Sequence, residues 1–173
     1  LADFSGSLVV VGDVTNFDPE SFRDGTGEAV QGIWLDPARR DLTGVVKSRT
    51  ERIFDPEAYS PPLSFVVDLA RTGMPMGVKL GPGMPHEAIA RPEDIRSEAN
   101  PHPRVTAQWV EHEGSLVELV LWFNALAQEG VARTVTVLRQ EATGQAEDKG
   151  LRIHKTTLSS PYSAEQVTPV DEK

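Results

Sequence analysis

Residues 104–123 read RVTAQWVEHEGSLVELVLWF, and this stretch decides the fold class of the chain. In its first half Val105, Ala107 and Trp109 alternate with polar residues, which is the period of a half-buried strand. Its second half is the most apolar run in the sequence. Glu113-Gly114 lies between the halves and is typical of a tight turn, so we expect a β-hairpin.

The apolar half also fits a helix. Ser115-Leu116-Val117-Glu118 matches a capping box, and Gly130 is suited to end a helix over residues 116–129. Such a helix would be apolar nearly all round and would need burial on every side. The short turn favours the hairpin, and the helix stays the alternative. In either case the segment belongs to the core.

Further strand patterns lie on both sides of this stretch. Arg133 to Arg139 alternates and is rich in β-branched residues, and Leu151 to Leu158 follows as a last strand, so we expect the second half to be a meander. Before the hairpin, the clearest alternation is in Leu63 to Leu69, which we also predict to be a strand. Other strands are expected over residues 7–11, 29–35 and 42–54.

These patterns predict a mainly β fold, because short strands and abundant Gly and Pro outweigh the few helical signals. We expect an antiparallel sandwich or barrel of about 7–9 strands. Residues 1–158 would form a single β-rich domain with an irregular connecting arm over 73–103. Residues 159–173 have no periodic apolar face and are predicted to be a flexible C-terminal tail.

The connecting arm contains six prolines and four glycines, and long irregular connections are usually functional. All three methionines of the chain lie in it, next to prolines. Methionine adapts to varied surfaces, so the arm suits docking onto a partner. The alternative is that the methionines fill gaps at the edge of the core. The predicted partner-binding residues are Met74, Pro75, Met76, Met84 and Pro85.

Composition excludes several classes of protein. The chain has 173 residues and no cysteine, which excludes disulfide frameworks, iron–sulfur sites and thiol nucleophiles. A formal charge of −9 disfavours a nucleic-acid partner. No apolar run is long enough to span a membrane, and the N-terminus lacks the basic and apolar regions of an intact signal peptide. We therefore favour a virion or cytoplasmic location.

No motif points to catalysis, a metal or a cofactor. The acidic segment Gly12 to Glu28 lacks the ligand spacing of an EF-hand, and its two phenylalanines and Asp18-Pro19 indicate a connection that packs its own side chains. Neither a phosphate-binding loop nor a Gly-x-Ser-x-Gly elbow is present. Trp34, Trp109 and Trp122 fall in expected strands, and we assign all three to the core.

One segment resembles a known family. Val9 to Leu35 forms a strand, a polar loop and a strand, with Asp24-Gly25-Thr26-Gly27-Glu28 at the turn, and is similar to the opening of small OB-fold single-stranded-DNA-binding proteins. The resemblance carries no site residues. A nucleic-acid groove would instead be lined by the basic strand residues Lys47, Arg49 and Arg52.

We therefore predict a non-enzymatic structural or assembly protein, such as a β-rich subunit of a virion, tail or similar multi-copy particle. It would contact copies of itself or neighbouring subunits through the Pro-rich arm, because such segments gain order on a partner. The alternative is an OB-fold-like module that binds single-stranded nucleic acid. A third hypothesis is a hydrolase with an unidentified carboxylate pair.

Overall fold

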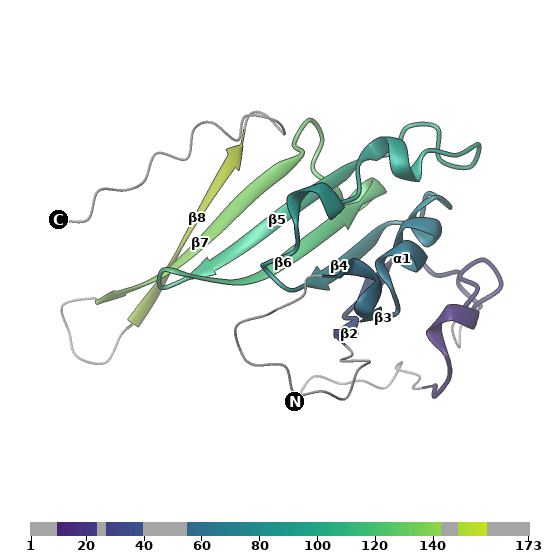
Figure 1. The fold of residues 1–173 in the computed structure, drawn as a ribbon, viewed down its shortest axis with the longest axis horizontal. Coiled ribbons are helices and arrows are strands. Elements are labelled where there is room, and N and C mark those ends of the chain that lie inside the picture. The colour runs from purple at the N-terminus through teal and green to yellow at the C-terminus, as the bar shows by residue number, and fades with distance from the viewer. Residues whose placement is uncertain (1–9, 24–26, 40–54, 143–148, 159–173) are drawn as a thin grey trace.

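The computed structural model describes residues 10–23, 27–39, 55–142 and 149–158 (Figure 1). A six-stranded mixed sheet with the order β1-β4-β6-β5-β7-β8 dominates it, and β2 and β3 form a separate two-stranded sheet. The strands are β1 (Ile33–Leu35), β2 (Ala38–Arg39), β3 (Tyr59–Ser60), β4 (Met76–Leu80), β5 (Val105–His112), β6 (Ser115–Phe123), β7 (Arg133–Ala142) and β8 (Lys149–Leu158). The helical elements are α1 (Leu63–Ala70) and the 3-10 turns η1 (Val14–Asn16), η2 (Pro56–Ala58), η3 (His86–Ala88), η4 (Pro92–Ile95) and η5 (Asn124–Leu126).

The mainly β class is confirmed, but the finer architecture is not. The six-stranded sheet does not close on itself, and α1 packs on it as a second layer (Figure 1). A barrel or sandwich is therefore not confirmed. Among the described residues, no helix is both long and apolar enough to cross a membrane.

The expected hairpin is confirmed as β5 and β6. The two strands pair antiparallel from Val105 opposite Phe123 to His112 opposite Ser115. Glu113 and Gly114 form the turn with φ values of 50° and 84°, the positive values that a tight hairpin turn of the primed type requires. The alternative prediction of a helix over residues 116–129 is wrong, because residues 115–123 form strand β6.

The expected meander needs a correction at β7. This strand pairs in parallel with β5 and lies on the side of β5 away from β6, while β8 pairs antiparallel with β7. The reason is that β4 already occupies the other edge of β6. The chain after β6 therefore crosses to the free edge of β5 before it continues the sheet.

The predicted strand over Leu63 to Leu69 is wrong, because these residues form helix α1. Since β1 and β4 are neighbours in parallel, the chain between them must cross over the sheet, and a helix does this. The fully buried positions of α1 have helical spacing. A short apolar run fits both periods, and only the crossover selects the helix. These buried residues are Leu63, Val66, Leu69 and Ala70.

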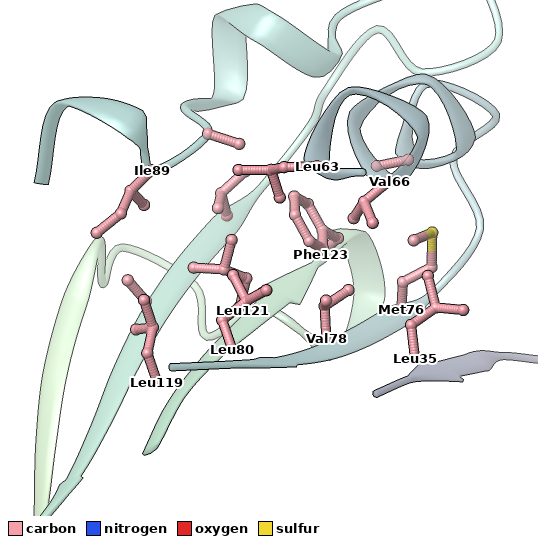
Figure 2. Close-up of a cluster of buried hydrophobic side chains, with 14 of the residues drawn as sticks. Leu35, Leu63, Val66, Met76, Val78, Leu80, Ile89, Leu119, Leu121 and Phe123 are labelled. Atoms are coloured by element: carbon pink, nitrogen blue, oxygen red, sulfur yellow. The ribbon is translucent and has the colours of Figure 1, made fainter. Parts of the chain in front are cut away.

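The core lies between α1 and the middle of the sheet (Figure 2). Three rows of side chains run across β4, β6 and β5 on the face toward the helix. Every side chain in these rows is less than a tenth exposed to solvent. The rows are Met76–Phe123–Val105, Val78–Leu121–Ala107 and Leu80–Leu119–Trp109.

Two buried asparagines join the end of α1 to the end of β6. Asn100 Nδ2 donates to Asn124 Oδ1 at 2.8 Å, and Asn124 Nδ2 donates to the carbonyl oxygens of Ala70 and Met74 at 3.0 and 2.8 Å. Asn124 adopts a φ of 57°, a region that asparagine tolerates better than most residues. The pair thus satisfies the carbonyl of Ala70 at the helix end and that of Met74 just before β4.

Several expectations fall wholly or partly outside the described residues. These are the strand over 42–54, which holds Lys47, Arg49 and Arg52, and the tail over 159–173. Of the strand expected over 7–11, only Val10 and Val11 are described; they belong to no strand and are 69% and 98% exposed. The strand expected over 29–35 is shortened to β1.

Two adjacent substitutions distinguish helix α1 from the expected strand. Val66 is fully buried, whereas Val67 is half-buried at the edge of the core. Val66→Asp should lower the free energy of unfolding by about 3 kcal/mol or more, because it buries an unpaired charge. Val67→Asp should cost clearly less. Urea denaturation measures both, and the opposite order would contradict the helix.

Candidate functional site

The candidate site is the sheet surface that faces away from α1, which we call the open face. Side chains alternate along each strand, so the residues between the core positions of β4 and β6 lie on this surface. Trp34 of β1, Gly77 of β4 and Trp122 of β6 stand in one row across three adjacent strands. Gln108 of β5 and Lys155 of β8 lie on the same side.

The indoles of Trp34 and Trp122 meet above Gly77. Their ring centroids are 5.7 Å apart, with a tilt of 49° between the rings. A Cβ atom at Gly77 would lie 2.6 Å from Cε3 of Trp34 and 2.9 Å from Cζ3 of Trp122, closer than real Cβ contacts. Glycine at this position is therefore what lets the two rings approach, and Trp34 remains 54% exposed.

A chain of hydrogen bonds fixes the orientation of Trp122. Its Nε1 donates to Oε1 of Gln108 at 2.7 Å, and Nε2 of Gln108 donates to Oγ1 of Thr136 at 2.8 Å. The chain crosses from β6 over β5 to β7 and uses both ends of the Gln108 amide. The ring is therefore positioned before any partner arrives, which reduces the entropy lost on binding.

A recess of about 220 Å³ lies beside Trp122. The connection over residues 124–132 forms its wall, anchored where Oγ1 of Thr106 donates to the carbonyl oxygen of Val131 at 2.7 Å. The hydroxyl of Thr134 likewise donates to a main-chain carbonyl. The indole, the half-exposed Leu126, the side chain of Gln128 and the ammonium group of Lys155 line the recess and can contact a partner.

The core assignment of the tryptophans is correct for only one of them. Trp109 is 6% exposed and stacks on His86 at a centroid distance of 5.1 Å. Trp34 and Trp122 lie on the open face instead. The end of β6 is apolar at every position, so the sequence pattern could not indicate which side of the strand faces the helix.

Not all of the predicted partner-binding residues of the arm are accessible to a partner. Met76 and Met84 are 0% and 3% exposed, so the gap-filling alternative describes these two methionines. The other three, Met74, Pro75 and Pro85, are half-buried and within reach of a partner. A docking role for them stays a prediction. The arm itself contains β4, an inner strand of the sheet.

The described part of the acidic segment behaves as a connection that packs its own side chains. The rings of Phe17 and Phe22 are 5.5 Å apart. Hydrogen bonds from Ser21 and from the backbone N–H of Glu20 lower the pKa of Asp18. The carboxylate of Asp13 accepts from the backbone N–H of Thr15. Within the described residues, no group of three or more His, Asp or Glu is placed to hold a metal ion.

The strands β7 and β8 extend beyond the rest of the sheet as a two-stranded ribbon. Each has ten residues, but β5 pairs with β7 only as far as Leu138. Glu111 accepts two hydrogen bonds from Arg139, one of them from Nη2 at 3.0 Å, and a third from the backbone N–H of Gly114 at 2.6 Å. The ion pair thus ties the ribbon to the β5–β6 turn, and Arg139 lowers the pKa of Glu111.

No protein-family model matches the chain, and neither the curated proteins nor the solved structures provide a match.

Gly77→Ala should separate the two indoles. The added methyl group needs space that Trp34, on an edge strand, can yield more easily than the hydrogen-bonded Trp122. We expect a cost of about 1–3 kcal/mol in unfolding free energy, typical of overpacking. We also expect a change in the near-ultraviolet circular dichroism of the indole pair. An unchanged spectrum would show that the rings do not depend on Gly77.

The Glu111–Arg139 pair predicts a pH dependence of stability. The pKa of Glu111 is lower in the folded chain than the unfolded value of about 4.3. The pair therefore stabilises the fold above that value, and its contribution is lost as the pH falls through the lowered folded value. The stability difference between wild type and Glu111→Gln should shrink as the pH drops from about 6 to about 3. Denaturant titrations measure it, and a constant difference would contradict the pair's role.

Proposed function

We propose that this protein is a non-enzymatic assembly subunit that contacts copies of itself through the open face. A virion, a tail or a similar multi-copy particle is the kind of structure it would help to build. The single observation that supports this most is Trp34, an indole that is 54% exposed beside the ordered Trp122. Large aromatic side chains on a rigid surface are typical anchors of protein interfaces.

The charges on the open face favour a protein partner. Its centre is uncharged and consists of the two indoles and Gln108, with the buried Val120 beneath them. Charged residues of both signs, Lys79 and Glu118, flank this centre, which resembles an apolar interface with a polar rim. Two copies of a chain with a charge of −9 repel one another least where they meet across an uncharged surface.

The geometry of the open face suits a second sheet. Two sheets pack face to face at about 10 Å, with side chains of the inner faces filling the space between them. The indole of Trp34 and the side chain of Leu126 are half exposed and would be covered in such a contact. A twofold axis through this face would place the same residues of both copies against each other.

The Pro-rich arm would be secondary in this assembly. Its buried methionines belong to the core, so of the five predicted residues Met74, Pro75 and Pro85 could add contacts at its surface. The proposal thus keeps the predicted class of function and moves its main contact from the arm to the sheet.

Single-stranded nucleic acid is the second candidate for the open face. Bases stack on exposed aromatic rings, and Lys79 and Lys155 lie on the same side of the sheet as the indoles. Against this, Lys79 is already paired with Asp36 at 3.1 Å, and the chain is strongly acidic. An oligonucleotide partner would quench tryptophan fluorescence at low salt and lose affinity steeply as salt rises.

Trp34→Ser tests the assembly proposal. Losing a tryptophan anchor costs about 2 kcal/mol or more, so self-association should weaken at least about tenfold. Sedimentation equilibrium over a range of concentrations measures the effect. The matched control is Leu116→Ser, which changes a residue of similar exposure, 53%, beside the hairpin turn. This control should associate like the wild type.

Two results would overturn the proposal. One is a wild-type protein that stays monomeric at high concentration. The other is a tryptophan fluorescence that an oligonucleotide quenches in the wild type but not in Trp34→Ser. That result would assign the open face to nucleic acid.

A further inference from the structure

The strand β8 offers an edge that pairs with no other described strand. It is the last strand of the six-stranded sheet, and residues 153–157 are all exposed. Ile153, an apolar residue in the middle of the strand, is 62% exposed. A long strand edge presents a row of backbone donors and acceptors and can accept an additional strand from another chain.

The charge of β8 restricts which strand can pair with it. The strand carries three cationic residues, one histidine and no acidic residue, in a chain with a net charge of −9. If two copies paired β8 with β8, these like charges would stand opposite one another, which is unfavourable. The edge therefore selects an uncharged or acidic strand. The basic residues are Lys149, Arg152, His154 and Lys155.

A suitable strand is present in the same sequence. The run Ser7-Leu8-Val9-Val10-Val11 is rich in β-branched residues and has no charge, and Asp13 follows it. Its described residues Val10 and Val11 belong to no strand and are 69% and 98% exposed. Two valines at this exposure leave apolar surface in water that strand pairing would cover.

The β8 edge that this run could reach belongs to another copy. In Figure 1 the purple segment near the start of the described chain and β8 lie on opposite sides of the view. The first strand after this segment, β1, is at one edge of the sheet and β8 is at the other. Pairing within one chain would require the run to cross the whole sheet.

We propose that the run ending in Val10 and Val11 adds as a strand to the β8 edge of a neighbouring copy. This inference rests on the proposed function, since it assumes self-association, but it names a contact separate from the open face. The contact joins two different surfaces, so each copy both donates a run and accepts one. Such contacts build rings or open chains rather than closed pairs.

Because the chain has no cysteine, single-cysteine variants report this contact directly. Val11→Cys mixed with His154→Cys under mild oxidation should give a disulfide-linked heterodimer. The control mixes Val11→Cys with Ser64→Cys, which places a thiol at an exposed position on α1. We expect the first mixture to cross-link at least about tenfold faster than the control, because pairing brings the thiols within disulfide reach.

Charge reversal supplies a second readout. Lys155→Glu, introduced with His154→Cys, should slow the cross-link several-fold at low salt and less at high salt, where charges are screened. The cross-link should persist in a Trp34→Ser background, since that residue belongs to the other contact. A wild type that associates, but whose cross-linking matches the control, would overturn this inference alone. A wild type that stays monomeric would overturn the proposed function as well.

Discussion

The pairing of β4 with β6 is the interaction on which the rest of the molecule depends. It joins the first half of the chain to the β5–β6 hairpin of the second half. On one side, this pairing aligns Val78 with Leu121 under α1, where the core forms. On the other side it sets Gly77 against Trp122 and so creates the space that Trp34 enters. One register thus determines both the buried and the exposed surface of the sheet.

Sequence patterns predicted the hairpin well, because a turn signal and alternation agreed there. They failed at α1, where an eight-residue apolar run fits a helix and a strand equally. What selects the helix is the parallel pairing of Ile33 with Met76, a contact between residues far apart in the sequence. The position of β7 depended in the same way on β4 occupying the edge of β6. Local patterns carry no information about such long-range pairings.

The candidate site was largely hidden for a related reason. Alternation relates the neighbours of one strand to each other, but it does not tell which side of a sheet receives the helix. Trp122 and Phe123 are equally apolar, and only the packing of α1 buries Phe123 and leaves the indole half-exposed. For the exposure of Trp34 the sequence held only a weak signal, namely a tryptophan in a short strand that follows several glycines. The burial of Met76 likewise followed from β4 lying inside the sheet, and Met84, in the connection after β4, packs into the same core.

The separation of paired residues along the chain also has a consequence for how the molecule folds. The hairpin closes through Glu113 and Gly114, so its contacts are local and form at low entropic cost. By contrast, β1 must find β4 across the whole intervening segment, including α1. We infer that Trp34 reaches Trp122 after the hairpin has formed. The coupling of the two indoles would then be a late kinetic signal, and its appearance together with the earliest β structure would contradict this order.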